Sequence, residues 1–307
     1  VIDTPGMREL GMWDSGDGIE TAFAVALARR LGGAIISADS RQVYRGLDIG
    51  SGKDLEEYRT GGEPVMTRLL DIIDPAEAEP YTLADFMRDA KAAVLELESL
   101  GKVPIICGGT GLYIHALIKG YELPGGPADR AFRNSVKDAD TEALVSELSA
   151  THTLENGEAE NPYRLSRRLE IERAPQTRSI YGGPLPDTEY LVLGALRPRP
   201  EIHKRIEKRL DERLRHGMIE EIQNLHNQGV PWEKLESFGL EYREVSRFLQ
   251  GEMLFPDMRD HLLIKIRQFA KRQDTWFRKM EREGVTIHWL PPENIEEAEA
   301  LCRESLA

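Results

Sequence analysis

The sequence is poor in cysteine and in long apolar runs, and each shortage excludes a class of protein. Its only cysteines among 307 residues are Cys107 and Cys302, so it has no disulfide framework. No stretch approaches the roughly 18 apolar residues that cross a bilayer. The amino-terminal VIDTPGMREL lacks the basic and then apolar layout of a signal peptide. We therefore expect a cytoplasmic protein with no membrane attachment.

Basic residues are outnumbered, and this bears on the choice of partner. The 40 Lys and Arg against 53 Asp and Glu give a net charge of −13. Taken alone, that balance argues against a nucleic-acid partner. The charge is unevenly distributed, however, because 164–173, 203–217 and 265–279 are basic whereas acidic residues gather in 74–80 and 293–300. A local basic face and solvated helix faces with i,i+4 ion pairs both fit this pattern.

Hydrophobic spacing predicts a parallel α/β sheet in the first part of the chain. A helix over 20–33 precedes a buried strand over 34–38, and a second helix is predicted over 82–102. Another buried strand over 103–111 runs into glycines and a helix over 112–120. This alternation is typical of parallel sheets, whose ligands bind at the carboxyl ends of the strands.

The rest of the chain is predicted to be mainly helical. Two helices, over 128–149 and 161–174, follow a Pro- and Gly-rich break. One more strand within 188–201 is expected to return to the sheet, and long charged helices cover 201–228 and 256–282. The predicted organisation is an atypical amino terminus over 1–21, an α/β core with carboxyl-terminal helices over 22–125 and 186–307, and a helical insert over 126–185.

Two strand ends carry the first candidate catalytic residues. Asp39 follows the first buried strand, where a carboxylate can accept a proton or a hydrogen bond in a cleft. The same position fits a turn or N-cap aspartate. The second strand ends in GGTG, 108–111, which lets the backbone approach a ligand and offers the Thr110 hydroxyl. A tight strand-to-helix turn would use the same glycines.

Two cations are candidate phosphate ligands. Lys53 lies in GSGKD, outside any Walker motif, because Asp54 follows it where Ser or Thr is required. Arg209 is spaced to share a helix face with Arg205 and Arg213. Such a row suits a diphosphate or a nucleic-acid backbone, and a solvated helix face explains it equally well.

Basic and aromatic residues are interleaved in QFAKRQDTWFRK, residues 268–279. This composition suits RNA, which is bound through phosphate contacts and base stacking. The aromatic residues fit equally well on the core face of a long helix.

Together, these stretches resemble one family over residues 22 to 290. The family is the tRNA dimethylallyltransferases, isopentenyl transferases that modify an adenine of the anticodon loop. The matching pieces are, in order, ISADSRQVYRGLDIGSGKD, LLDIIDP, YTLADFMRDA, PIICGGTGLYI, RLSRRLEI, KRIEKRLDERLRHGMIEEI, SFGLEYRE and QFAKRQDTWFRKMEREGVTIHWL. The resemblance implies a P-loop NTPase-like α/β core. It also implies transfer of a dimethylallyl group from dimethylallyl diphosphate to N6 of adenine, with Mg²⁺ bridging the diphosphate.

The resemblance further implies roles for individual residues. Asp39 would hold or deprotonate the exocyclic amine beside Thr110, and Arg209 would bind the diphosphate together with Thr21 and Lys53. It assigns no residue as a metal ligand. The expected tRNA contacts are Ser40, Arg41, Gln42, Arg133, Arg164, Leu165, Ser166, Arg167, Gly239, Tyr242, Arg243, Lys271, Arg272, Gln273, Trp276 and Arg278. The partners would be a tRNA anticodon stem-loop and dimethylallyl diphosphate, and we expect a monomer because no heptad seam is evident.

The amino terminus departs from the family. The phosphate-binding loop GPTASGKT should occupy residues 14–21, where this chain has DSGDGIET. Only Thr21 matches, and Glu20 replaces the phosphate-binding lysine, so a carboxylate would face the diphosphate. Thr67 also stands where the family usually has histidine. The preceding residues 1–14 resemble the DTPG segment of ribosome-associated, circularly permuted GTPases. We interpret this terminus as a foreign graft that replaces the family's first strand and loop.

Three alternatives to an active tRNA prenyltransferase stay open. One is a tRNA-binding remnant without turnover, since a single preorganised donor is worth roughly 10²–10³ in rate. A second is a GTPase, suggested by DTPG alone. A third is prenylation of free adenine nucleotides, against which the basic carboxyl-terminal region argues because a nucleotide needs no stem-loop grip.

Overall fold

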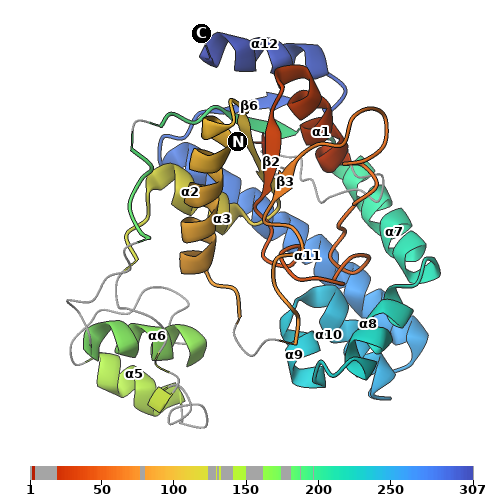
Figure 1. The fold of residues 1–307 in the computed structure, drawn as a ribbon. Helices are drawn as coiled ribbons and strands as arrows, with labels where there is room; N and C mark the ends of the chain where they lie inside the picture. The colour runs from red at the N-terminus through yellow and green to blue at the C-terminus, as the bar shows by residue number, and fades with distance from the viewer. Residues whose placement is uncertain are drawn as a thin grey trace. The chain divides into compact units, whose positions relative to one another are not determined.

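The computed structural model describes residues 2–3, 19–76, 80–123, 129, 131–132, 141–149, 162–173, 181–186, 188–195 and 197–306. The chain divides into two compact units (Figure 1). The first combines Val1–Ile118 with Pro186–Ala307, and the second is Lys119–Leu185.

A parallel sheet forms the centre of the first unit. Among the described residues its six strands run in the order β3-β2-β4-β1-β5-β6, and every neighbouring pair is parallel. The strands are β1 Ile2–Asp3, β2 Ala34–Ser37, β3 Thr67–Arg68, β4 Pro104–Gly108, β5 Val192–Ala195 and β6 Ile287–Leu290. All four residues of β2 and of β5 are buried, as expected of a sheet covered on both faces. The predicted parallel α/β core is confirmed.

The strand β1 comes from the amino-terminal segment that we interpret as a graft. Ile2–Asp3 pairs with β4 on one side and with β5 on the other. The segment therefore supplies a central strand of the sheet. Residues 4–18, which include most of the DSGDGIET stretch, lie outside the described residues.

Helices α1 Ile19–Leu31 and α12 Ile295–Ser305 pack side by side against one end of this unit (Figure 1). The guanidinium of Arg30 on α1 pairs with Glu299 of α12 at 2.7 Å. These contacts join the first and last helices of the described residues, so α1 is held by the carboxyl-terminal helix as well as by the sheet.

Helix α2, Leu83–Ser99, follows directly from local sequence signals. The Thr82 hydroxyl accepts a hydrogen bond from the Asp85 backbone N–H at 3.3 Å, and the Asp85 carboxylate accepts one from the Thr82 N–H at 3.0 Å. This reciprocal pair is a capping box. Gly101, with a φ of 67°, follows the helix in the left-handed region. The buried face carries Phe86, Met87, Ala90, Ala93, Val94 and Leu97.

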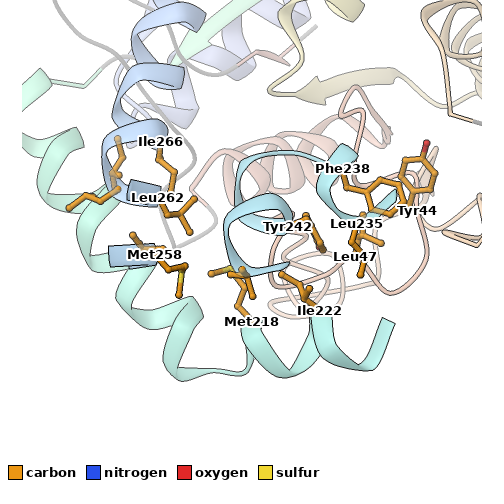
Figure 2. Packing of buried hydrophobic residues seen from close by; sticks show 14 of the residues in the cluster. Tyr44, Leu47, Met218, Ile222, Leu235, Phe238, Tyr242, Met258, Leu262 and Ile266 are labelled. Atoms are coloured by element: carbon orange, nitrogen blue, oxygen red, sulfur yellow. The ribbon is translucent and has the colours of Figure 1, made fainter. Parts of the chain in front are cut away.

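A second core lies among the helices that connect β5 to β6: α7 Arg199–Arg215, α8 Met218–Asn227, α9 Trp232–Ser237, α10 Leu240–Leu249 and α11 Phe255–Arg282. Tyr44 and Leu47, from the loop after β2, pack into this core with Ile222 of α8 and Tyr242 of α10 (Figure 2). Leu47 and Tyr242 are fully buried. The loop that begins at Asp39 is thus anchored against the helices as well as against the sheet.

The second unit begins at Lys119, the last residue of α3 (Gly111–Lys119), and has a small helical core of its own. Helices α5 Thr141–Ser149 and α6 Pro162–Arg173 lie within the two ranges predicted to be helical. Their contact is apolar and is made by Phe132, Leu144, Leu148, Leu165 and Leu169.

Candidate functional site

Asp39 lies immediately beyond the carboxyl end of β2, and its carboxylate is held by its own turn. One oxygen, Oδ1, accepts hydrogen bonds from the backbone N–H groups of Arg41 at 2.8 Å and Gln42 at 3.2 Å. This is the geometry of an Asx turn. The other oxygen lies near Gly109, where an added Cβ would be 3.9 Å from Oδ2. The turn role and the catalytic role are therefore compatible, because each uses a different oxygen.

Thr110, from the end of β4, is tied to the same turn. Its Oγ1 accepts a hydrogen bond from the Ser40 N–H at 3.1 Å, and its own N–H donates to the Ala38 carbonyl at 3.2 Å. A Cβ on Gly108 would lie 2.5 Å from the Ala38 backbone, so only glycine allows this approach. The structure thus brings Asp39, Ser40 and Thr110 together at the carboxyl ends of β2 and β4.

Helix α11 crosses the same edge. Gln273 is 7% exposed and donates from Nε2 to the Gly109 carbonyl at 2.9 Å. Its Oε1 is buried and has no hydrogen-bond partner within the described part of the chain. Trp276 lies over Gly111, where a Cβ would be 1.8 Å from the indole Cδ1. The glycines of GGTG therefore bring α11 into direct contact with the strand end.

Replacing Gly111 by alanine is expected to push α11 off this edge. Because overpacking of a tightly filled contact typically costs about 1–3 kcal/mol, we expect a lower Tm. The control is Leu112→Ala, which removes a 39% exposed side chain at the next position. Thermal unfolding followed by circular dichroism measures both variants. An unchanged Tm for Gly111→Ala would show that Trp276 moves aside freely.

A pocket of about 230 Å³ is formed between α7 and the loop that follows β2. It is lined by Asp48, Ile49, Gly52, Lys53, Asp54, Arg209, Glu212, Arg213 and His216. Arg209 is only 3% exposed although it carries a permanent charge. Arg209 and Arg213, one turn apart on α7, are therefore aimed into the pocket rather than along a solvated helix face.

One side chain connects the Asp39 turn to the pocket. Gln42, whose backbone N–H is bound by Asp39, donates from Nε2 to the Gly52 carbonyl at 3.3 Å. Its Oε1 accepts from the Ser37 hydroxyl at 3.2 Å. Gly52 lines the pocket. Gln42 therefore contacts both the Asp39 carboxylate and the wall of the basic pocket.

Lys53 lines the pocket, but its ammonium group already has partners. The group is fully buried and donates to the Tyr44 carbonyl and the Asp48 carboxylate, each at 2.9 Å. It also pairs with the Asp71 carboxylate. Asp71 has a φ of 53°, a backbone conformation that is uncommon outside glycine. A diphosphate would have to displace one of these carboxylates, and Lys53's contact with it stays a prediction.

Thr21, the remaining residue expected at the diphosphate, lies in the first turn of α1 and is half-buried. The five residues before α1 that complete the expected loop with it lie outside the described residues. Its role also stays a prediction.

The residues expected to bind tRNA fall into exposed and buried groups. The exposed ones in the first unit are Arg243, Lys271, Arg272 and Arg278. The guanidinium groups of Arg41 and Arg272 each lie 5.6 Å from the Phe269 ring centroid. Gly239, with a φ of 132°, leaves room for Arg41, whose guanidinium carbon would be 2.9 Å from an added Cβ. Tyr242 is fully buried, so its contribution to RNA binding is indirect.

The other expected tRNA contacts belong to the second unit. On α6, Arg164 is exposed, whereas Leu165 is fully buried and Ser166 is 8% exposed. Arg167 pairs with Glu170 at 2.9 Å. Leu165 therefore serves the core of this unit, and Arg164 is the residue of the group that faces solvent. Arg133 lies outside the described residues.

Two glutamates near the site, Glu221, which is half-buried, and Glu241, which is buried, were missed by sequence reasoning. Glu221 on α8 accepts hydrogen bonds from the loop that lines the pocket, and burial raises the pKa of its carboxyl against the opposing effect of those bonds. Glu241 on α10 is 1% exposed and pairs with Arg41 at 3.0 Å. In the sequence, both glutamates lie in stretches typical of charged, solvent-exposed helices. Their position in the helix does not indicate that they bind segments far away in the chain.

The described residues contain no metal-binding cluster and no membrane-spanning helix. Within them, no group of three or more His, Cys, Asp or Glu side chains is placed to hold a metal ion. No helix in the same part of the chain has the length and apolar character needed to cross a bilayer.

Comparison with known proteins gives a consistent result. The family model for IPP transferase matches residues 42–280. The chain is 42% identical over 286 residues to tRNA dimethylallyltransferase 1 of Syntrophus aciditrophicus, covering 90% of this chain and 91% of that protein. It is 44% identical over 273 residues to tRNA dimethylallyltransferase 2 of Pelobacter propionicus, covering 88% and 85%.

Solved structures agree. A tRNA isopentenylpyrophosphate transferase from Bacillus halodurans aligns with a TM-score of 0.68 at 28% identity, covering 99% of this chain and 96% of that one. A eukaryotic dimethylallyltransferase acting on tRNA aligns with a TM-score of 0.69 over 99% of this chain and 77% of that one. Its identity is 21%, so it supports the fold alone.

Proposed function

We propose that this chain, which belongs to the IPP transferase family, transfers a dimethylallyl group from dimethylallyl diphosphate to N6 of an adenine in the tRNA anticodon loop. One observation supports this assignment above the others. A carboxylate fixed at the sheet edge, Asp39, lies beside Thr110 and is linked through Gln42 to the basic pocket. The reaction needs these two halves, one for the amine and one for the leaving group.

The amine half is centred on Asp39. When N6 attacks the allylic carbon, the new N–C bond forms as the C–O bond to diphosphate breaks, and N6 must lose a proton. The Asp39 oxygen that its turn does not use can orient the N–H and accept that proton. A positioned base of this kind contributes about 10²–10⁴-fold. The adenine must leave its stack for N6 to reach the Asp39 carboxylate, as in other enzymes that modify bases.

The leaving-group half is the pocket on α7. Negative charge builds up on the diphosphate as the C–O bond breaks. Arg209 and Arg213 are fixed on one helix, so their guanidinium groups need little rearrangement to stabilise that charge. Guanidinium forks also match phosphate oxygens in geometry. In this assignment Lys53 fixes the pocket wall through its pairs with Asp48 and Asp71.

A magnesium ion fits this pocket as a helper bound mainly by the substrate. Mg²⁺ usually takes one or two protein carboxylates and completes its shell with phosphates and water. Asp48 and Asp54 are the aspartates that line the pocket together with the arginines, and their carboxylates would be the ligands from the protein. When bound, the ion would neutralise charge on the diphosphate.

The tRNA grip is proposed to use the exposed cations of α10 and α11. Arg243, Lys271, Arg272 and Arg278 provide positive charge on a chain of net charge −13. Phosphate contacts of this kind fix the position of the RNA, and the base pocket supplies selectivity. We also propose a cytoplasmic monomer, in keeping with the unbridged Cys107 and Cys302.

Removing the Arg209 charge tests the leaving-group half. In Arg209→Gln, we expect kcat/KM for dimethylallyl diphosphate to fall about 10²-fold, because one preorganised donor is lost. The KM for an anticodon stem-loop should stay near the wild-type value. The matched control is Lys208→Gln, whose side chain on the same helix is 62% exposed.

Transfer of labelled dimethylallyl to stem-loops with adenine or guanine at the target position provides the measurement. The assignment of Arg209 is wrong if Arg209→Gln and Lys208→Gln have the same kinetics. The proposed activity itself is wrong if the labelled group is transferred without dependence on the adenine.

A further inference from the structure

We infer that Glu221 is a positioning residue for diphosphate binding, because its carboxylate holds loop 48–53 in the shape that forms one wall of the Arg209 pocket. This inference rests on the proposed function in taking that pocket as the diphosphate site. Glu221 lies on α8, more than one hundred residues from the loop in sequence, and does not line the pocket itself.

Both carboxylate oxygens of Glu221 are fully used. Oε2 accepts hydrogen bonds from the backbone N–H groups of Asp48 at 3.1 Å and Ile49 at 2.5 Å. Oε1 accepts from the Gly50 N–H at 3.0 Å and from the Tyr242 hydroxyl at 2.8 Å. Three successive backbone N–H groups that converge on one anion form a nest, an arrangement that also binds phosphate. Here the protein's own carboxylate fills the nest.

The loop held in this way shapes the pocket. Residues 48, 49, 52 and 53 line it opposite Arg209 of α7. Arg213, also in the lining, donates to the Gly50 carbonyl at 3.5 Å. The three N–H groups that Glu221 binds therefore belong to the segment that faces the arginines. If the loop shifts, the wall and the Arg213 contact shift with it.

Close packing holds Glu221, Tyr242 and the loop in fixed positions. A Cβ on Gly50 would lie 2.7 Å from the Tyr242 ring, so the loop backbone rests directly on the tyrosine. Met218 and Ile222, on either side of Glu221 in α8, are fully buried in the core that also contains Tyr242 (Figure 2). Helix, tyrosine and loop are thus held together, and the carboxylate is the polar centre of the contact.

Burial works against the ionised form of the Glu221 carboxyl. Burial raises the pKa of the Glu221 carboxyl, and nearby Asp48 acts in the same direction, although hydrogen bonds from Ile49, Gly50 and Tyr242 oppose the rise. Between the ordinary and the raised pKa the folded state binds more protons than the unfolded state, so stability falls as pH rises through that window. Four donors nevertheless converge on this carboxylate, and three of them are backbone N–H groups of the loop, so its hydrogen bonds tie α8 to the loop backbone.

The variant Glu221→Gln tests the inference. Glutamine has one carbonyl oxygen and one NH₂ group, so whichever way it lies its NH₂ faces donors and part of the nest is left without an acceptor. We expect the affinity for inorganic pyrophosphate to weaken about tenfold and the KM for dimethylallyl diphosphate to rise by a similar factor, as for loss of a hydrogen bond to a charged group. The stem-loop KM and the Tm should stay near the wild-type values.

The matched control is Glu220→Gln, an exposed residue on the same helix, which should behave as wild type. Pyrophosphate binding is measured by calorimetry, transfer by the labelled assay, and Tm by circular dichroism. If Glu221→Gln does not fold, the variant Tyr242→Phe provides the test. It removes one donor to Oε1 of Glu221 and leaves the carboxylate and the three N–H groups in place. It should weaken pyrophosphate binding in the same direction, by less.

Unchanged pyrophosphate affinity in the folded variant would overturn the inference, and so would equal rises in both KM values together with a lower Tm. It would also fail if the wild-type protein bound no pyrophosphate. If the wild type binds pyrophosphate more tightly than Glu221→Gln but transfers nothing to adenine, the inference holds and the proposed function fails.

Discussion

The substitution Asp39→Asn is expected to lower kcat for dimethylallyl transfer about 10²–10⁴-fold, the range for loss of a positioned general base. Asparagine keeps an oxygen that can accept the N–H groups of Arg41 and Gln42, so the turn should survive. It cannot accept the proton that N6 must lose. Binding of the stem-loop should therefore change little while turnover falls.

Single-turnover transfer measures kcat, and fluorescence anisotropy with a labelled stem-loop measures the Kd. Asp74→Asn is a matched control, because Asp74 is an exposed aspartate whose Oδ1 accepts the Ala76 N–H at 2.8 Å in a similar turn. Equal rates for Asp39→Asn and Asp74→Asn would leave Asp39 with a turn role only.

Restoring the family's phosphate loop is expected to have an effect of similar size. Replacing DSGDGIET by GPTASGKT at residues 14–21 should raise the transfer rate by about 10²–10³-fold or more, since one preorganised donor alone is worth that much. The change removes the carboxylate of Glu20 and adds a lysine and a glycine-rich backbone that can donate N–H groups to the diphosphate.

The first experiment would compare the two chains in transfer of labelled dimethylallyl to a stem-loop with adenine at the target position. If only the restored chain reacts, the present one is a crippled copy that retains the tRNA site. Similar rates would mean that Arg209 and Arg213 are sufficient for the leaving group, and our account of the loop would be wrong. If neither reacts but both bind the stem-loop, the chain is a tRNA-binding remnant.

Local sequence signals anticipated the elements that have strong periodicity or clear ends. Strands β2 and β4 read as short apolar runs, and α2 carried its Thr82 cap and Gly101 stop. Helices α9, α10 and α12, and strands β1, β3 and β6, were not predicted. The three strands are four residues or fewer, and α9 and α10 are short helices flanked by Pro231 and Gly239. In segments this short, periodicity gives little signal, and tertiary packing decides the structure.

In the candidate site, too, some features could be predicted from the sequence and others could not. Asp39 and Thr110 could be expected to meet because parallel strands bring their carboxyl ends to one edge. The sequence alone also determined the family, and with it the reaction class, since the motifs extend over most of the chain.

Only the tertiary structure decided which charged side chains face a substrate and which face each other. Lys53 is spaced like a phosphate ligand, yet Asp48 and Asp71 surround its ammonium. Glu221 looks like a surface residue of α8, yet it binds the backbone of a loop more than 170 residues earlier in the chain. The physical reason is that ion pairs and buried hydrogen bonds depend on distances of a few ångströms between segments far apart in sequence. Those distances are set when the helices pack against the sheet.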